Sequence, residues 1–184
     1  MKQNIEKQIE AIKQLNEFSL KKEIVILGST YMANFPLYEL INKSQIEHAV
    51  YNRSFEGLTI QEAMQIYKEC VVDINPKKVF LSLGEEDQNS PTAIQDYNSL
   101  IRNIRRAIPD VQLFLICLNG ESEYVKEFNQ NIIKQCDGKY VNYIKLAQSE
   151  TQSVNKYRSH FKQLSCFFRE KAISMSEAFA ISRV

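Results

Sequence analysis

Three loops carry the side chains of this chain that could do chemistry. Gly28-Ser29-Thr30 follows an apolar run and offers hydroxyl groups, and Asn52 to Gly57 forms a second polar segment. Gly84-Glu85-Glu86-Asp87 gathers three carboxylates. A hydroxyl that attacks a carbonyl needs a base to take its proton and preorganised donors to stabilise the oxyanion that forms. Hydroxyls, carboxylates and glycine-rich turns are residue types that such acyl transfer uses.

A candidate base lies late in the chain. His160 stands in the segment Tyr157-Arg158-Ser159-His160-Phe161, just before an expected last helix. The only other histidine, His48, precedes an apolar strand end, and we interpret it as structural. Histidine changes its charge near neutral pH and is the side chain most often used as a general base. His160 is therefore the candidate base.

Apolar periodicity predicts the elements that position these residues. Apolar side chains at helical spacing predict an N-terminal amphipathic helix over Lys2–Phe18, within residues 1–20. Apolar runs predict five strands, at Glu23–Leu27, Glu47–Tyr51, Lys78–Leu83, Val111–Leu118 and Val141–Leu146. Helical patterns lie between them, near residues 36–43, 59–73, 91–107 and 121–135, and a last helix runs from about Phe161.

Strands that alternate with helices predict an α/β fold. The expected architecture is a three-layer α/β/α sandwich with a mainly parallel, five-stranded sheet, because right-handed crossovers place helices on both faces. Functional groups in such sheets collect on the loops beyond the carboxyl ends of the strands. The three polar loops each follow a predicted strand, so we expect them at one edge of the sheet.

The order and spacing of these motifs resemble the SGNH, or GDSL, hydrolases, which include esterases, lipases, acetylhydrolases and thioesterases on a flavodoxin-like fold. Gly28-Ser29-Thr30 matches the family's Gly-Asp-Ser block, and this places Thr30 where the nucleophilic Ser stands. Asn52 to Gly57 fits the Asn-x-x-x-x-Gly block, with the backbone N–H of Gly57 in the oxyanion hole. The resemblance covers nearly the whole chain, and we expect a single domain over residues 1–184.

Two further blocks depart from the family pattern. Gly84 to Asp87 keeps the Gly and Asp of Gly-x-Asn-Asp, but Glu86 stands where the resemblance implies an oxyanion-hole Asn. Tyr157 to His160 keeps the His of Asp-x-x-His, with Tyr157 in place of Asp. An ionised Glu86 only accepts hydrogen bonds and would repel an oxyanion, and Tyr157 supplies no charge to stabilise an imidazolium. The methyl group of Thr30 also restricts its rotation and crowds an incoming carbonyl carbon.

The resemblance implies hydrolysis of a small acyl or acetyl ester, with Thr30 as nucleophile and His160 as base. The substitutions predict weak activity, and the alternative is a non-catalytic relative that binds a ligand or a protein. Simpler interpretations remain open for individual residues. Thr30 could cap the turn or the following helix, and Glu85 to Asp87 could be a solvated acidic turn in which Asp87 accepts backbone hydrogen bonds.

Composition narrows the other possibilities. Hydrophobic residues make up 44% of the chain and the net charge is +1, which argues against disorder and against nucleic acid as a partner. Four cysteines without a C-x-x-C pair, and no glycine-rich phosphate loop, predict no metal and no cofactor. The start has no apolar signal core and no stretch is long enough to span a membrane, so we expect a cytoplasmic protein. The apolar segment 173–181 predicts packing on the domain or a homo-oligomer.

Overall fold

The computed structural model describes residues 3–147 and 154–169. The chain divides into two compact units. The first, here called the sheet unit, comprises the chain up to Asn34 and Val50–Lys145. The second unit comprises Phe35–Ala49 and the chain from Leu146 onward. The expectation of a single domain stays a prediction, and the apolar segment 173–181 lies outside the described residues.

A five-stranded parallel sheet forms the centre of the sheet unit. Its strands are β1 (Ile24–Gly28), β2 (Val50–Asn52), β3 (Lys78–Ser82), β4 (Gln112–Ile116) and β5 (Val141–Ile144). The spatial order is β2-β1-β3-β4-β5, with every pair parallel. This is the flavodoxin-like order, in which the direction of winding reverses between β1 and β3. The predicted α/β fold with a parallel five-stranded sheet is confirmed.

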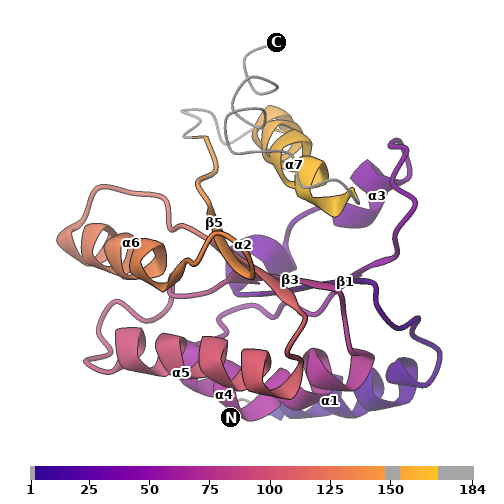
Figure 1. Cartoon of the computed structure of the whole chain (residues 1–184), viewed down its shortest axis with the longest axis horizontal. Coiled ribbons are helices and arrows are strands. Elements are labelled where there is room, and N and C mark those ends of the chain that lie inside the picture. The colour runs from indigo at the N-terminus through magenta and orange to yellow at the C-terminus, as the bar shows by residue number, and fades with distance from the viewer. Residues whose placement is uncertain (1–2, 148–153, 170–184) are drawn as a thin grey trace. The chain divides into compact units, whose positions relative to one another are not determined.

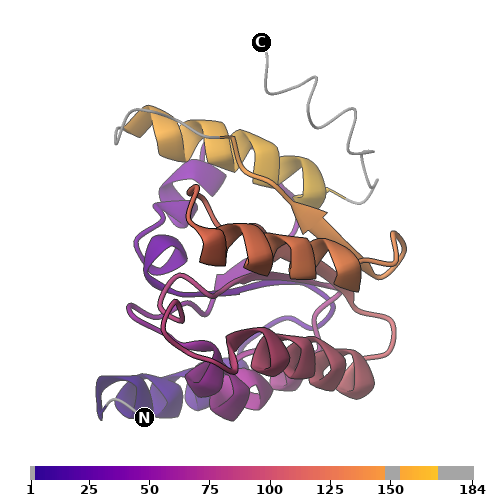
Figure 2. The ribbon, with the colours of Figure 1, turned by 90° about the vertical axis from the view of Figure 1, so that its left-hand side faces the viewer.

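Helices α1 (Gln3–Asn16), α4 (Ile60–Cys70) and α5 (Ala93–Ala107) lie along one face of this sheet (Figures 1 and 2). The short α2 (Thr30–Ala33) follows β1, and α6 (Glu123–Gln135) follows β4. A 3₁₀ turn, Val72–Ile74, precedes β3. The second unit contains α3 (Leu37–Ile41) and α7 (Val154–Phe168). In the described residues, no helix has both the length and the apolar character needed to cross a membrane.

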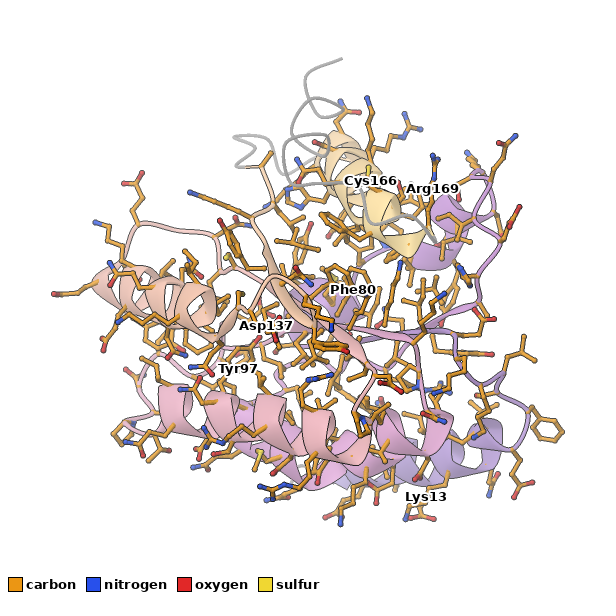
Figure 3. The ribbon with its side chains drawn as sticks, in the orientation of Figure 1. Lys13, Phe80, Tyr97, Asp137, Cys166 and Arg169 are labelled. Carbon is orange, nitrogen blue, oxygen red and sulfur yellow. The ribbon has the colours of Figure 1, made fainter. Side chains whose placement is uncertain are left out.

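The main core lies between the sheet and helices α1, α4 and α5. Successive strand residues point to opposite faces, so Val79 and Leu81 point into this core while Phe80 lies on the other face. Tyr97 of α5 is fully buried in this core, with its ring 5.1 Å from that of Phe128 in α6 (Figure 3). On the other face, the Phe80 ring stacks on Phe114 at 4.8 Å. Both faces of the sheet are therefore buried, as the continuous apolar runs predict.

Three details of the predicted elements are wrong. Strand β2 begins at Val50 rather than Glu47, and the four-residue α2 is not foreseen because it is too short to show a period. Helix α7 begins at Val154 rather than near Phe161, so His160 lies inside the last helix and not before it. The buried face of α7 includes His160 with Phe161 and Leu164. Because His160 is polar, an apolar pattern does not extend the helix back to Val154.

Candidate functional site

The turn from β1 into α2 depends on Gly28. A Cβ atom at this position would lie 2.7 Å from Cβ of Met32 and 3.0 Å from the carbonyl oxygen of Ser82, so only glycine fits. The next residue, Ser29, is fully buried, and its backbone N–H donates to the same carbonyl of Ser82 at 2.9 Å. Close packing of β1 against β3 therefore fixes where Thr30 emerges.

The loop after β2 is tied to the same turn. The Asn52 side chain donates to the carbonyl oxygen of Met32 at 2.9 Å, and its Oδ1 accepts from the Ser54 N–H at 3.1 Å. The Phe55 N–H donates to the Gly28 carbonyl at 3.1 Å. The loop then turns at Gly57, which has a φ of +66°. These bonds hold the Gly57 backbone beside Thr30.

The loop after β3 is anchored by Asp87. This residue is 3% exposed, and its two carboxylate oxygens accept from the Ile60 N–H at 3.1 and 3.2 Å, at the start of α4. Burial raises the pKa of the Asp87 carboxyl, and the bond from Ile60 partly opposes this shift. The predicted role of Asp87, to hold the loop by accepting backbone hydrogen bonds, is confirmed.

The Thr30 hydroxyl joins all three loops. It donates to Oε1 of Glu86 at 2.7 Å, and its oxygen accepts from the Gly57 N–H at 2.8 Å. It does not cap α2, since Ser29 occupies the N-cap position and Thr30 is the first residue of the helix. The structure therefore brings together Thr30, Gly57 and Glu86, three of the residues singled out from the sequence.

Glu85 is a site residue that the sequence reasoning missed. Its Oε1 accepts from the Tyr31 N–H at 2.8 Å. Burial raises the pKa of the Glu85 carboxyl, while hydrogen bonds from Tyr31, Ser29 and Thr30 lower it in part. Glu86 is exposed and Glu85 is half-buried, so the acidic run is not simply a solvated turn. The run of three acidic residues contains no signal that tells which carboxylate turns toward the backbone.

The remaining two candidates, Tyr157 and His160, lie in the second unit. His160 is fully buried, and its Nε2 is 2.8 Å from the carbonyl oxygen of Ala147. A carbonyl only accepts, so Nε2 carries the hydrogen of this bond. Burial lowers the pKa of His160, and the bond to Ala147 partly opposes the shift. The Tyr157 ring packs edge-on against Phe35, with centroids 5.4 Å apart.

Comparison with known proteins identifies the fold. No family model matches the sequence, and no curated protein matches it. A solved structure from Streptococcus pneumoniae, described as a candidate platelet activating factor, is similar with a TM-score of 0.76 at 17% identity, over 89% of this chain and 92% of that one. A GDSL-like lipase from Bacteroides thetaiotaomicron gives a TM-score of 0.62 at 11% identity, over 94% and 92% of the two chains. The chain has the fold of the SGNH hydrolases.

A further structure with the SGNH fold is a psychrotrophic esterase from Pseudoalteromonas, with a TM-score of 0.58 at 16% identity, over 74% of this chain and 86% of that one. Sequence identities this low show a shared fold and do not show a shared activity. In this SGNH fold, the Thr30–Glu86–Gly57 cluster lies at the carboxyl ends of β1, β2 and β3. That edge, at the reversal of strand order, is where open α/β sheets bind ligands.

Proposed function

We propose that this protein hydrolyses small acyl or acetyl esters slowly, with the Thr30 hydroxyl as nucleophile. The observation that carries the proposal is the pair of hydrogen bonds on Thr30 Oγ1, 2.7 Å to Glu86 and 2.8 Å from Gly57. The bond to Glu86 directs the hydroxyl hydrogen of Thr30 at a proton acceptor. The bond from Gly57 places a backbone N–H beside the oxygen that would attack the ester. A nucleophile held this way meets the geometric requirement for activation.

The donors for an oxyanion belong to the backbone. The resemblance to SGNH hydrolases assigns the oxyanion contacts to the N–H groups of Thr30 and Gly57 and the base to His160, and Tyr157 stands in place of the family's Asp. The Gly57 N–H lies 2.8 Å from Thr30 Oγ1, so we expect it to reach the oxygen of an acyl carbon bonded there. Backbone donors need little reorganisation, so they stabilise the tetrahedral intermediate efficiently.

Two features support a slow reaction. Glu86 occupies the position of an Asn donor, and the loss of one oxyanion donor costs about 10²–10³ in rate. The Glu85 carboxylate accepts from the Tyr31 N–H at 2.8 Å and also bonds to the Thr30 N–H, so an ester oxygen has to compete with a carboxylate for that donor. The proposed nucleophile therefore lies among carboxyl groups that accept the available hydrogen-bond donors.

The proposal is tested with short-chain chromogenic esters and two variants of Thr30. Thr30→Ala removes the hydroxyl and is expected to reduce hydrolysis to the uncatalysed background. Thr30→Ser keeps the hydroxyl without the crowding methyl group, and we expect it to hydrolyse faster than the unmodified protein. Rates are compared at matched protein concentration, with circular dichroism to verify that each variant is folded.

A second candidate is a non-catalytic protein that keeps the SGNH fold for ligand binding. The contact of Glu85 with the backbone N–H groups of Thr30 and Tyr31 favours it, because a carboxylate already engages donors that catalysis needs. Equal background rates for the unmodified protein and Thr30→Ala would overturn the hydrolase proposal for these esters. That outcome would leave binding as the function to examine.

A further inference from the structure

We propose that Glu86, and not His160, is the general base that takes the proton from Thr30. This inference rests on the proposed ester hydrolysis and assigns its proton transfer. The Thr30 hydroxyl donates to Oε1 of Glu86 at 2.7 Å, within the 2.6–3.2 Å reach that general-base catalysis requires. Glu86 is exposed and Thr30 is half-buried.

The hydrogen bond of His160 argues against the use of its Nε2 as the base. This nitrogen faces the carbonyl oxygen of Ala147 at 2.8 Å, so it carries a hydrogen, and the lone pair of the neutral ring lies on Nδ1. The Ala147 backbone is itself held, because its N–H donates to Oε1 of Gln163 at 3.1 Å. Gln163 and His160 lie on the same helix, α7, so both bonds fix one stretch of chain to one helix face. This arrangement fits a structural role for His160.

The loop around Glu86 gives its carboxylate a defined position. The carboxylate of Asp87, its neighbour, accepts from the Ile60 N–H at the start of α4, and Gly84, at the start of the same loop, is buried. Glu85, the neighbour on the other side, accepts a hydrogen bond from the Tyr31 N–H at 2.8 Å. Neighbours on both sides are thus fixed, and the Glu86 side chain extends from a short, anchored segment.

The reaction balances with Glu86 as the only proton carrier. Thr30 Oγ1 forms a bond to the acyl carbon while its proton moves to Oε1 of Glu86. The tetrahedral intermediate then breaks its bond to the alcohol oxygen, which receives that proton and leaves as the free alcohol. In the second half, water attacks the Thr30 ester, Glu86 takes the water proton and returns it to Thr30 Oγ1, and the carboxylic acid is released.

The test removes the carboxylate in two ways. Glu86→Gln keeps the shape but cannot take a proton, and we expect the hydrolysis rate to fall about 10²–10⁴-fold, the usual contribution of a general base. Glu86→Ala opens space beside Thr30, so added formate should restore part of the lost rate. Glu127→Gln on the exposed face of α6 removes a carboxylate elsewhere and serves as the matched control.

The outcomes separate this inference from the proposed function. Loss of activity in Thr30→Ala together with equal or faster hydrolysis by Glu86→Gln would overturn the base role while the hydrolase proposal stands. Loss in both Glu86 variants without formate rescue would assign Glu86 a positioning role and also overturn it as the base. Full activity in Thr30→Ala would overturn the hydrolase proposal itself, and with it the inference.

Discussion

At the scale of single residues, Glu85 is a carboxyl group whose burial opposes ionisation. Burial raises the pKa of this carboxyl above its ordinary value, so the folded state favours the protonated form. The sign follows from linkage: the stabilising contribution is complete below the ordinary Glu pKa and is lost as the pH rises through the raised pKa. Ionisation of Glu85 therefore destabilises the fold.

Glu85→Gln is expected to unfold at a higher temperature than the unmodified protein at neutral pH. Gln is uncharged and keeps a carbonyl oxygen that accepts from the Tyr31 N–H. The gain should be below about 1 kcal/mol because the side chain is only half-buried and water screens its charge. Thermal unfolding should show the difference shrinking as the pH falls below the ordinary Glu value.

The matched control is Glu127→Gln, which removes an exposed carboxylate and should show no such trend. A difference for Glu85→Gln that grows at acidic pH would contradict the raised pKa.

The carboxylates of this loop also show what the sequence alone cannot predict. The positions of Gly84 and Asp87 after β3 can be predicted from the sequence. Glu85 and Glu86 are chemically alike, and only the folded backbone decides which one accepts from the Thr30 hydroxyl and which from the Tyr31 N–H.

At the scale of elements, the loop after β3 depends on contact with α6. Gly84 has a φ of +108°, and a Cβ atom there would lie 2.6 Å from Cζ of Phe128. Its carbonyl oxygen accepts from the Tyr124 hydroxyl at 2.8 Å. Gly84 therefore meets two separate demands, a backbone conformation that L side chains rarely adopt and a close approach to an aromatic ring.

Gly84→Ala is expected to destabilise the protein more than Gly138→Ala. Gly138 has a φ of +71° with nothing within 4 Å of its added Cβ, so its substitution carries the backbone strain alone, about 1–2 kcal/mol. The clash with the buried Phe128 should add about 1–3 kcal/mol. Denaturant unfolding of both variants measures the difference, and equal losses would show that the ring moves aside without cost.

The elements themselves were predictable to different degrees. Strands such as β3 are continuous apolar runs, and α5 has a clear amphipathic period, so both are recognised from local pattern. Helix α2 has four residues and shows no period. The first turns of α7 are rich in polar residues, so they show no apolar period. Its buried face includes His160, whose ring is hydrogen-bonded to the Ala147 carbonyl oxygen. Contacts between distant segments, not local propensity, set these boundaries.

At the scale of the whole molecule, the chain path ties the second unit to the sheet unit. Phe35–Ala49 is joined at one end to α2 and at the other to β2, and the rest of the second unit follows β5. The two segments of the second unit are separated in the sequence by Val50–Lys145, which belongs to the sheet unit. The second unit is therefore not one continuous stretch of chain that could fold alone. This connectivity favours the single domain expected from the length of 184 residues.

We therefore predict one cooperative unfolding transition that both units share. The chain contains no Trp, so a single introduced Trp reports on its own surroundings. Tyr124→Trp places the probe in the sheet unit, and Tyr157→Trp places it in the second unit beside Phe35. Fluorescence of both variants should give the same midpoint in denaturant, coincident with circular dichroism of the backbone. Two separated midpoints, with the Tyr157→Trp probe changing first, would show that the second unit unfolds on its own and would contradict the single domain.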